Sequence, residues 1–170
     1  MTTTASTAEP AAALGAQDIG KRVLALIQSI HGIGDLTPAN IEKQTGMRVE
    51  VNPDDPNDYG VSGKLAGDWY YGLRTMSGDP GQKPNRLLFQ FNDQSNANAD
   101  MTPVCVSFDE YNRTLTEAGF SATRLRNRMN TQDYWEFTRD DVGVTVYVRG
   151  KRAPDDAQTC VSMLIINAYA

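Results

Sequence analysis

Few residues in this chain are of the types that carry out catalysis. His31 is the only histidine among the 170 residues, and it lies at the end of an expected helix, where histidine is common because it interacts well with the helix dipole. Nucleophilic catalysis needs a nucleophile, a base and an orienting group together, and the chain contains no GxSxG, GxGxxG, HExxH or P-loop motif. We therefore expect a protein that is not an enzyme and that has no cofactor and no metal site.

The acidic side chains leave one catalytic alternative open. Two carboxylates that converge in a fold can cleave a glycosidic bond, but the spacing of the 21 acidic residues singles out no pair. Residues 52–58 are rich in aspartate, asparagine and proline, yet they lack the alternation and the glutamate of an EF-hand loop. We interpret this segment as a loop, and a carboxylate-dependent hydrolase remains an alternative.

The two cysteines, Cys105 and Cys160, fit one disulfide bond. Cys105 precedes an expected helix and Cys160 begins the last expected strand, so the two side chains can approach each other. A disulfide persists in an oxidising compartment, which predicts a periplasmic or otherwise exported protein. If both thiols stay reduced in the core, the alternative is a cytoplasmic protein.

Residues 1–17 are rich in threonine, alanine and serine, and they predict a flexible tether. They have neither the basic nor the apolar region of a signal peptide. This composition suits a spacer that remains when a signal peptide or a lipid-bearing leader has been cut away, and it suits a frayed natural terminus equally well. Residues 18–170 then form a single folded domain.

Charge and hydropathy argue against two classes of partner. With a net charge of -5, the chain lacks the surplus of basic residues that binding to nucleic acid requires. Its mean hydropathy is -0.46, and no apolar run is long enough to cross a bilayer. We therefore expect a protein partner.

The hydrophobic pattern predicts an α+β fold in which two or three helices pack on one face of an antiparallel sheet. Residues 18–30 have apolar side chains at helical spacing with Asp18 as the N-cap, and a second helix begins at Thr37 and ends at Gly46. Ser107 begins a third helix with a capping box. Alternation predicts strands within residues 47–51, 67–76, 86–91, 123–129, 132–150 and 160–168.

The segment 132–150 is the clearest hairpin, because its two alternating arms meet at the turn-forming residues Asp140, Asp141 and Gly143. In the upstream arm Trp135 and Phe137 share one face, which leaves Tyr134 and Glu136 on the other.

The order of helix and strands occurs twice, which predicts a tandem repeat of a helix-plus-sheet unit. The two sub-units are residues 18–92 and 104–170, and the polar residues 93–103 link them. This arrangement resembles the architecture of β-lactamase-inhibitor-like proteins. The chain is also similar, in size and in its lack of catalytic motifs, to small bacterial effector-immunity and inhibitor proteins. The resemblance implies that the exposed face of the sheet presents aromatic and charged residues to an enzyme.

Aromatic and basic residues supply the candidate binding surface, because tyrosine, tryptophan and arginine contribute most interface hot spots. Alternation separates Trp69 and Tyr71 from Tyr70 and Arg74, and residues 123–129 carry three arginines on one face of a strand. The candidate partner-binding residues are Tyr70, Arg74, Arg124, Arg126, Arg128, Tyr134 and Glu136.

We therefore predict a non-enzymatic inhibitor or immunity protein that neutralises a bacterial enzyme or secreted toxin. The alternative is a carrier of small apolar ligands, with a pocket between helices and sheet lined by Trp69, Phe89 and Trp135.

Overall fold

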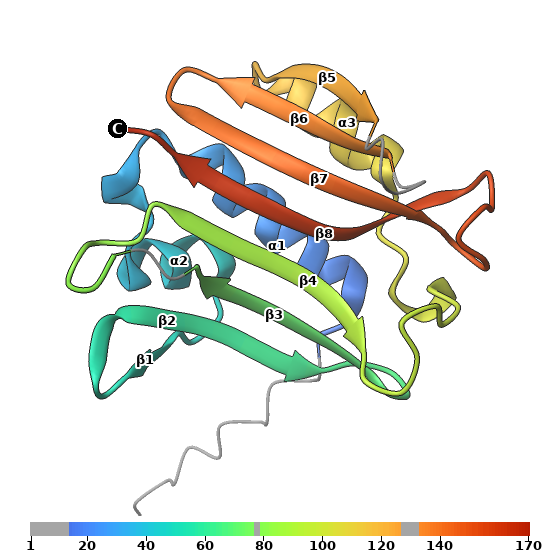
Figure 1. Cartoon of the computed structure of the whole chain (residues 1–170), viewed down its shortest axis with the longest axis horizontal. Helices are drawn as coiled ribbons and strands as arrows, with labels where there is room; N and C mark the ends of the chain where they lie inside the picture. Colours follow the sequence, from blue (N-terminus) through green and yellow to red (C-terminus); the bar gives the residue numbers. More distant parts are fainter. Residues whose placement is uncertain (1–13, 77–78, 127–132) are drawn as a thin grey trace, which may run out of the picture.

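The computed structural model describes residues 14–76, 79–126 and 133–170, which form three α-helices and one eight-stranded antiparallel sheet (Figure 1). Two short 3-10 helices, η1 (Ile33–Asp35) and η2 (Thr102–Val104), lie in the connections. The α-helices are α1 (Ala16–Ser29), α2 (Pro38–Thr45) and α3 (Phe108–Glu117). The strands are β1 (Glu50–Asn52), β2 (Asp55–Lys64), β3 (Trp69–Thr75), β4 (Arg86–Asp93), β5 (Ser121–Arg126), β6 (Asp133–Arg139), β7 (Val142–Gly150) and β8 (Thr159–Ala168).

The sheet has the strand order β1-β2-β3-β4-β8-β7-β6-β5. From either edge, four consecutive strands run inward in chain order, so β4 and β8 meet at the centre. Each set of four consecutive strands forms a meander, and β4 pairs antiparallel with β8 at the centre. Helices precede each meander, but the first has α1 and α2 whereas the second has α3 alone. The predicted α+β class with an antiparallel sheet is confirmed, and the tandem repeat stays a prediction.

Local sequence explains where the helices begin and end. Thr37 caps α2 by accepting a hydrogen bond from the Asn40 N–H at 3.2 Å, and Gly46 ends this helix in the left-handed conformation at φ +67°. The prediction for α1 is wrong in one respect. Its N-cap is Gly15, and Asp18 lies in the first turn, so the helix begins within the segment predicted as a tether.

The three helices lie on the same side of the sheet (Figure 1). The ring of Phe108 in α3 lies 5.2 Å from that of Trp135 in β6, and the Tyr111 hydroxyl donates to the main-chain oxygen of Gly20 in α1 at 2.7 Å. A row of directly paired residues crosses the sheet beneath the helices and is fully or almost fully buried: Val61, Leu73, Phe89, Leu164 and Val146. This row marks the helix-facing side of the sheet.

Two strand predictions need correction. Residues 52–58 were predicted as a loop, but Asp55 opens β2, and only a tight turn separates it from β1. Strand β2 escaped prediction because Gly60 and Gly63 interrupt its alternation, Pro53 precedes it and Pro56 lies within it. The predicted turn of the last hairpin is confirmed at Asp140 and Asp141, whereas Gly143 lies inside β7.

Candidate functional site on the open face of the sheet

Four of the predicted binding residues share the side of the sheet that faces away from the helices, which we call the open face. Directly paired residues in an antiparallel sheet point to the same side, and successive residues alternate. Tyr70 and Arg74 alternate with the buried Leu73 in β3, and Tyr134 and Glu136 alternate with Phe137 in β6. The structure therefore places these four residues on one face, but on strands separated by β4, β8 and β7.

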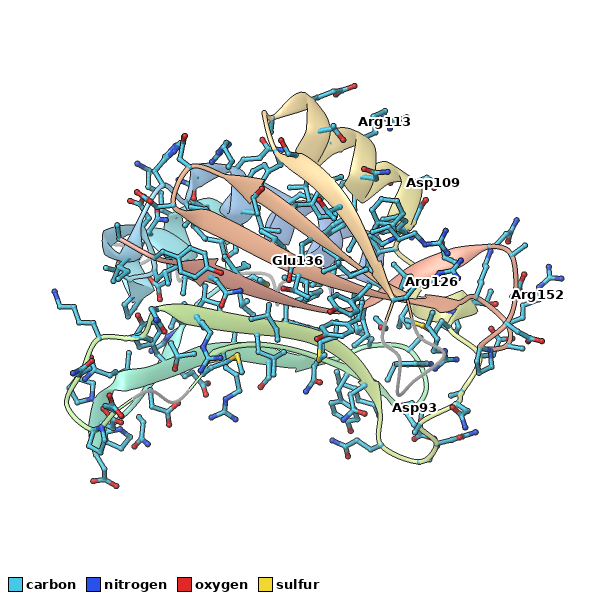
Figure 2. The ribbon with its side chains drawn as sticks, turned by 45° about the horizontal axis from the view of Figure 1, so that its top comes forward. Asp93, Asp109, Arg113, Arg126, Glu136 and Arg152 are labelled. Atoms are coloured by element: carbon cyan, nitrogen blue, oxygen red, sulfur yellow. A yellow bond between two sulfur atoms is a disulfide. The ribbon has the colours of Figure 1, made fainter. Side chains whose placement is uncertain are left out.

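The arginines of β5 do not join this surface. Arg124 pairs with Trp135, which contacts α3, so Arg124 and Arg126 lie on the helix-facing side at the edge of the sheet. The residue of β5 on the open face is instead Leu125, which pairs with Tyr134. In Figure 2, Arg126 lies at the end of β5 and Glu136 lies toward the middle of β6. Arg128 lies outside the described residues, and the six described candidates do not share one face of the sheet.

The centre of the open face carries apolar and aromatic side chains that the sequence analysis missed. We call this set the central belt: Leu88, Tyr134, Tyr147, Met163 and Ile165. All of them are half-buried, and no described element lies over them (Figure 1). Leu88 pairs with Ile165, and Met163 pairs with Tyr147, so the belt runs without interruption across β4, β8 and β7 to β6. The nearly continuous apolar run of β8 is the sequence feature that could have revealed the belt.

A hollow of about 710 Å³ adjoins the belt over β1, β2, β3 and β4, and we call it the β1–β4 hollow. Its lining on the open face includes Ser62, Tyr70, Gly72, Arg74, Gln90 and Asn92. The Arg74 guanidinium lies 3.4 Å from the Asp58 carboxylate at the rim. A hydrogen bond from Asn52, and then the contact with Arg74, hold the pKa of Asp58 below its ordinary value. Hydrogen-bonding side chains predominate over aliphatic ones in this hollow.

The residues predicted to line an apolar pocket fill the core instead. Phe89 is fully buried, Trp69 is nearly so, and the Trp135 ring packs against Phe108. These side chains therefore occupy the space between the helices and the sheet, and the β1–β4 hollow lies on the opposite side.

Residues 14–76, 79–126 and 133–170 contain no group of three or more histidine, cysteine, aspartate or glutamate residues able to hold a metal ion. No helix within these residues is long and apolar enough to span a membrane. His31 is exposed, and its main-chain N–H donates to the Asp35 carboxylate.

The predicted disulfide is present. Cys105 lies just before α3 and Cys160 lies at the start of β8, with their Cα atoms 5.0 Å apart. The main chain is also paired there, because Ser107 forms an isolated bridge with Cys160. The bond therefore fastens the segment before α3 to the sheet and lies away from the central belt.

The chain matches no protein-family model, and neither a curated protein nor a solved structure matches it significantly. The functional argument therefore rests on the geometry of the open face.

Proposed function

We propose that this protein is a non-enzymatic binding protein that docks a protein partner on the open face of its sheet. We further propose that the partner is a bacterial enzyme or secreted toxin, which the protein inhibits or neutralises. The resemblance in architecture to β-lactamase-inhibitor-like proteins supports this choice of partner, since two meanders of four strands lie side by side in one sheet.

The composition of β8 is the observation that carries the proposal. Antiparallel strands with one face in water usually alternate between apolar and polar residues. In β8, Leu164 and Ile166 are fully buried toward the helices, yet Met163 and Ile165 on the open face are apolar as well. An apolar second face is typical of a strand covered on both sides, and no described element of this chain covers that face. A partner protein supplies the missing cover.

The surroundings of the belt suit a protein interface. Interfaces have an apolar and aromatic core, a polar rim, and hot spots rich in tyrosine and arginine. Tyr134 and Tyr147 supply aromatic surface within the belt, while Arg74 and Glu136 supply charges of opposite sign beside it. Charged residues at a rim contribute to the rate and specificity of association more than to affinity.

The disulfide supports a periplasmic or otherwise exported location, because such bonds persist in oxidising compartments. In such a compartment the protein would encounter a secreted toxin or an extracytoplasmic enzyme.

The test is capture of the partner by the immobilised protein from lysate and secreted fractions of the source organism and of its close competitors, followed by mass spectrometry. We expect one stoichiometric partner, whose enzymatic or toxic activity falls when the purified protein is added.

Two substitutions in one row of the open face locate the interface. Ile165→Glu places a charge in the belt, whereas Thr123→Glu places the same charge on the exposed edge strand β5, in register with Ile165 through Thr145 and Glu136. We expect Ile165→Glu to abolish capture and Thr123→Glu to preserve it. Equal capture by both variants, or the absence of a stoichiometric partner, would contradict the proposal.

A further inference from the structure

Gly72 occupies an interior position of the sheet where packing does not require glycine. It lies in β3, which is paired on both sides, and a Cβ atom at this position meets no atom within 4 Å. Gly60 in the adjacent strand differs, because its Cβ would lie 2.4 Å from the main-chain oxygen of Leu73. Glycine weakens a strand interior, and it often marks a place where a ligand approaches the main chain closely. The missing side chain at Gly72 therefore leaves open space above β3 on this face of the sheet.

Side chains of β2, β3 and β4 surround the space over Gly72 on four sides. Tyr70 and Arg74 flank it along β3, since they lie two residues before and after it on the same face. Ser62 in β2 and Gln90 in β4 pair directly with Gly72 and flank it across the sheet. This space is the floor of the β1–β4 hollow, and the volume of about 710 Å³ falls within the usual range of small-molecule sites.

Several polar side chains that line the hollow are free to form hydrogen bonds with a ligand. Among the described residues, the side chains of Ser62, Tyr70, Gln90 and Asn92 make no hydrogen bond. The main-chain groups of β3 are used in pairing with β2 and β4, so a ligand would meet these side chains and not the backbone. Arg74 and Asp58 pair with each other, so the Glu50 carboxylate is the one other charged group in the lining of the hollow.

These features point to one chemical class of ligand. Amide and hydroxyl side chains both donate and accept hydrogen bonds, as sugar hydroxyls do. The face of an aromatic ring such as that of Tyr70 carries negative charge density, which attracts the C–H groups of a sugar ring. We propose that the β1–β4 hollow binds a neutral oligosaccharide, with one sugar ring over Gly72 and against Tyr70. An apolar peptide anchor suits the hollow less well, because its lining is mainly polar, whereas the central belt suits such an anchor.

The experiment is an NMR titration of the isotopically labelled protein with maltohexaose, cellohexaose, chitohexaose and mannohexaose. A neutral-glycan array then tests binding to a wider range of sugars. We expect saturable shifts of the Gln90 and Asn92 side-chain amides with at least one glycan. Gly72→Val fills the space and should abolish these shifts without lowering the melting temperature, because its Cβ meets no atom within 4 Å. Gln90→Met removes only the amide and should weaken binding by about tenfold, the value of one net hydrogen bond.

Thr138→Val is the matched control, because Thr138 is exposed on the same face of β6, outside the hollow. It should bind the glycan as the wild type does. The proposal is overturned if no neutral glycan binds, or if Gly72→Val and Gln90→Met both bind as the wild type does. Loss of protein capture in Gly72→Val without any glycan binding would assign the hollow to the protein interface. That result would overturn this inference and leave the proposed function standing.

Discussion

Tyr134 of β6 and Tyr147 of β7 stack their rings across neighbouring strands of the open face, with centroids 5.4 Å apart and planes inclined by 27°. Both side chains are half-buried, although the helices cover only the other side of the sheet. A stacked pair holds each ring in place, so little side-chain entropy is lost when a partner covers it. The pair is thus a preorganised part of the central belt.

Truncation of this pair should affect binding more than folding. We expect Tyr147→Ala to weaken partner binding by at least about thirtyfold, the effect of a hot spot worth about 2 kcal/mol. The melting temperature should fall by only a few degrees, since the ring is not part of the buried core. Surface plasmon resonance and thermal unfolding measure the two effects. Tyr147→Phe keeps the stacked ring and should retain most of the affinity, and an unaltered affinity in Tyr147→Ala would exclude the belt from the interface.

Loss of the disulfide should destabilise the fold strongly. Cys105 and Cys160 are separated by 55 residues in sequence, and a cross-link that closes a loop of this length contributes about 4 kcal/mol in the loop-entropy model. The double variant Cys105→Ala, Cys160→Ala should lose about this much free energy of unfolding, measured by denaturant titration. A reductant should lower the stability of the wild type and leave the double variant unchanged. Free thiols in the purified wild type would contradict this prediction.

Arg139 joins the ends of two helices to the sheet. Its guanidinium donates to the main-chain oxygens of Ala118 at 3.1 Å, Gln28 at 3.1 Å and Ile30 at 3.0 Å. It also lies 4.4 Å from the ring centroid of Phe120. These carbonyls are at the C-terminal ends of α1 and α3, where a cation is favourable.

We expect Arg139→Gln to lower the free energy of unfolding by about 3 kcal/mol, because several charge-assisted hydrogen bonds are lost. Arg139→Lys keeps the charge but cannot reach all three oxygens, so it should be intermediate. Partner affinity should be unchanged in both variants, because Arg139 faces the helices. Equal stability of Arg139→Gln and the wild type would show that the carbonyls find other donors.

Asp93 at the end of β4 and Asp100 in the connection to α3 should make stability depend on acid pH. Hydrogen bonds from the Ser95 hydroxyl and main chain lower the pKa of Asp93, and those from Thr102 lower the pKa of Asp100. A lowered pKa in the folded state means that the stabilisation is present above the unfolded value of about 3.9 and is lost as the pH falls through the folded value.

The variant Asp93→Asn, Asp100→Asn should therefore lose less stability than the wild type between about pH 5 and about pH 2. Melting temperatures measured across this range provide the test. Asp155→Asn, at an exposed position, is the control and should follow the wild type. Identical slopes for the wild type and the double variant would show that other groups govern acid unfolding.

The sequence by itself predicted the features that depend on neighbouring residues. Alternation placed Tyr70 with Arg74 and Tyr134 with Glu136 opposite the core residues, because side chains in any strand alternate with a period of two. Turn-forming residues located the hairpin at Asp140, and the two cysteines were correctly paired since no other partner exists in the chain.

Only the tertiary structure decided which strands are neighbours and which faces coincide. Arg124 lies on the helix-facing side because β5 aligns it with Trp135, and a shift of this register by one residue would have turned it to the open face. The pairing of β4 with β8 creates the central belt by joining Leu88 to Ile165, which are far apart in the chain. Such contacts depend on how whole segments pack, so local periodicity carries no information about them. The space over Gly72 is of the same kind, because it exists only between three aligned strands.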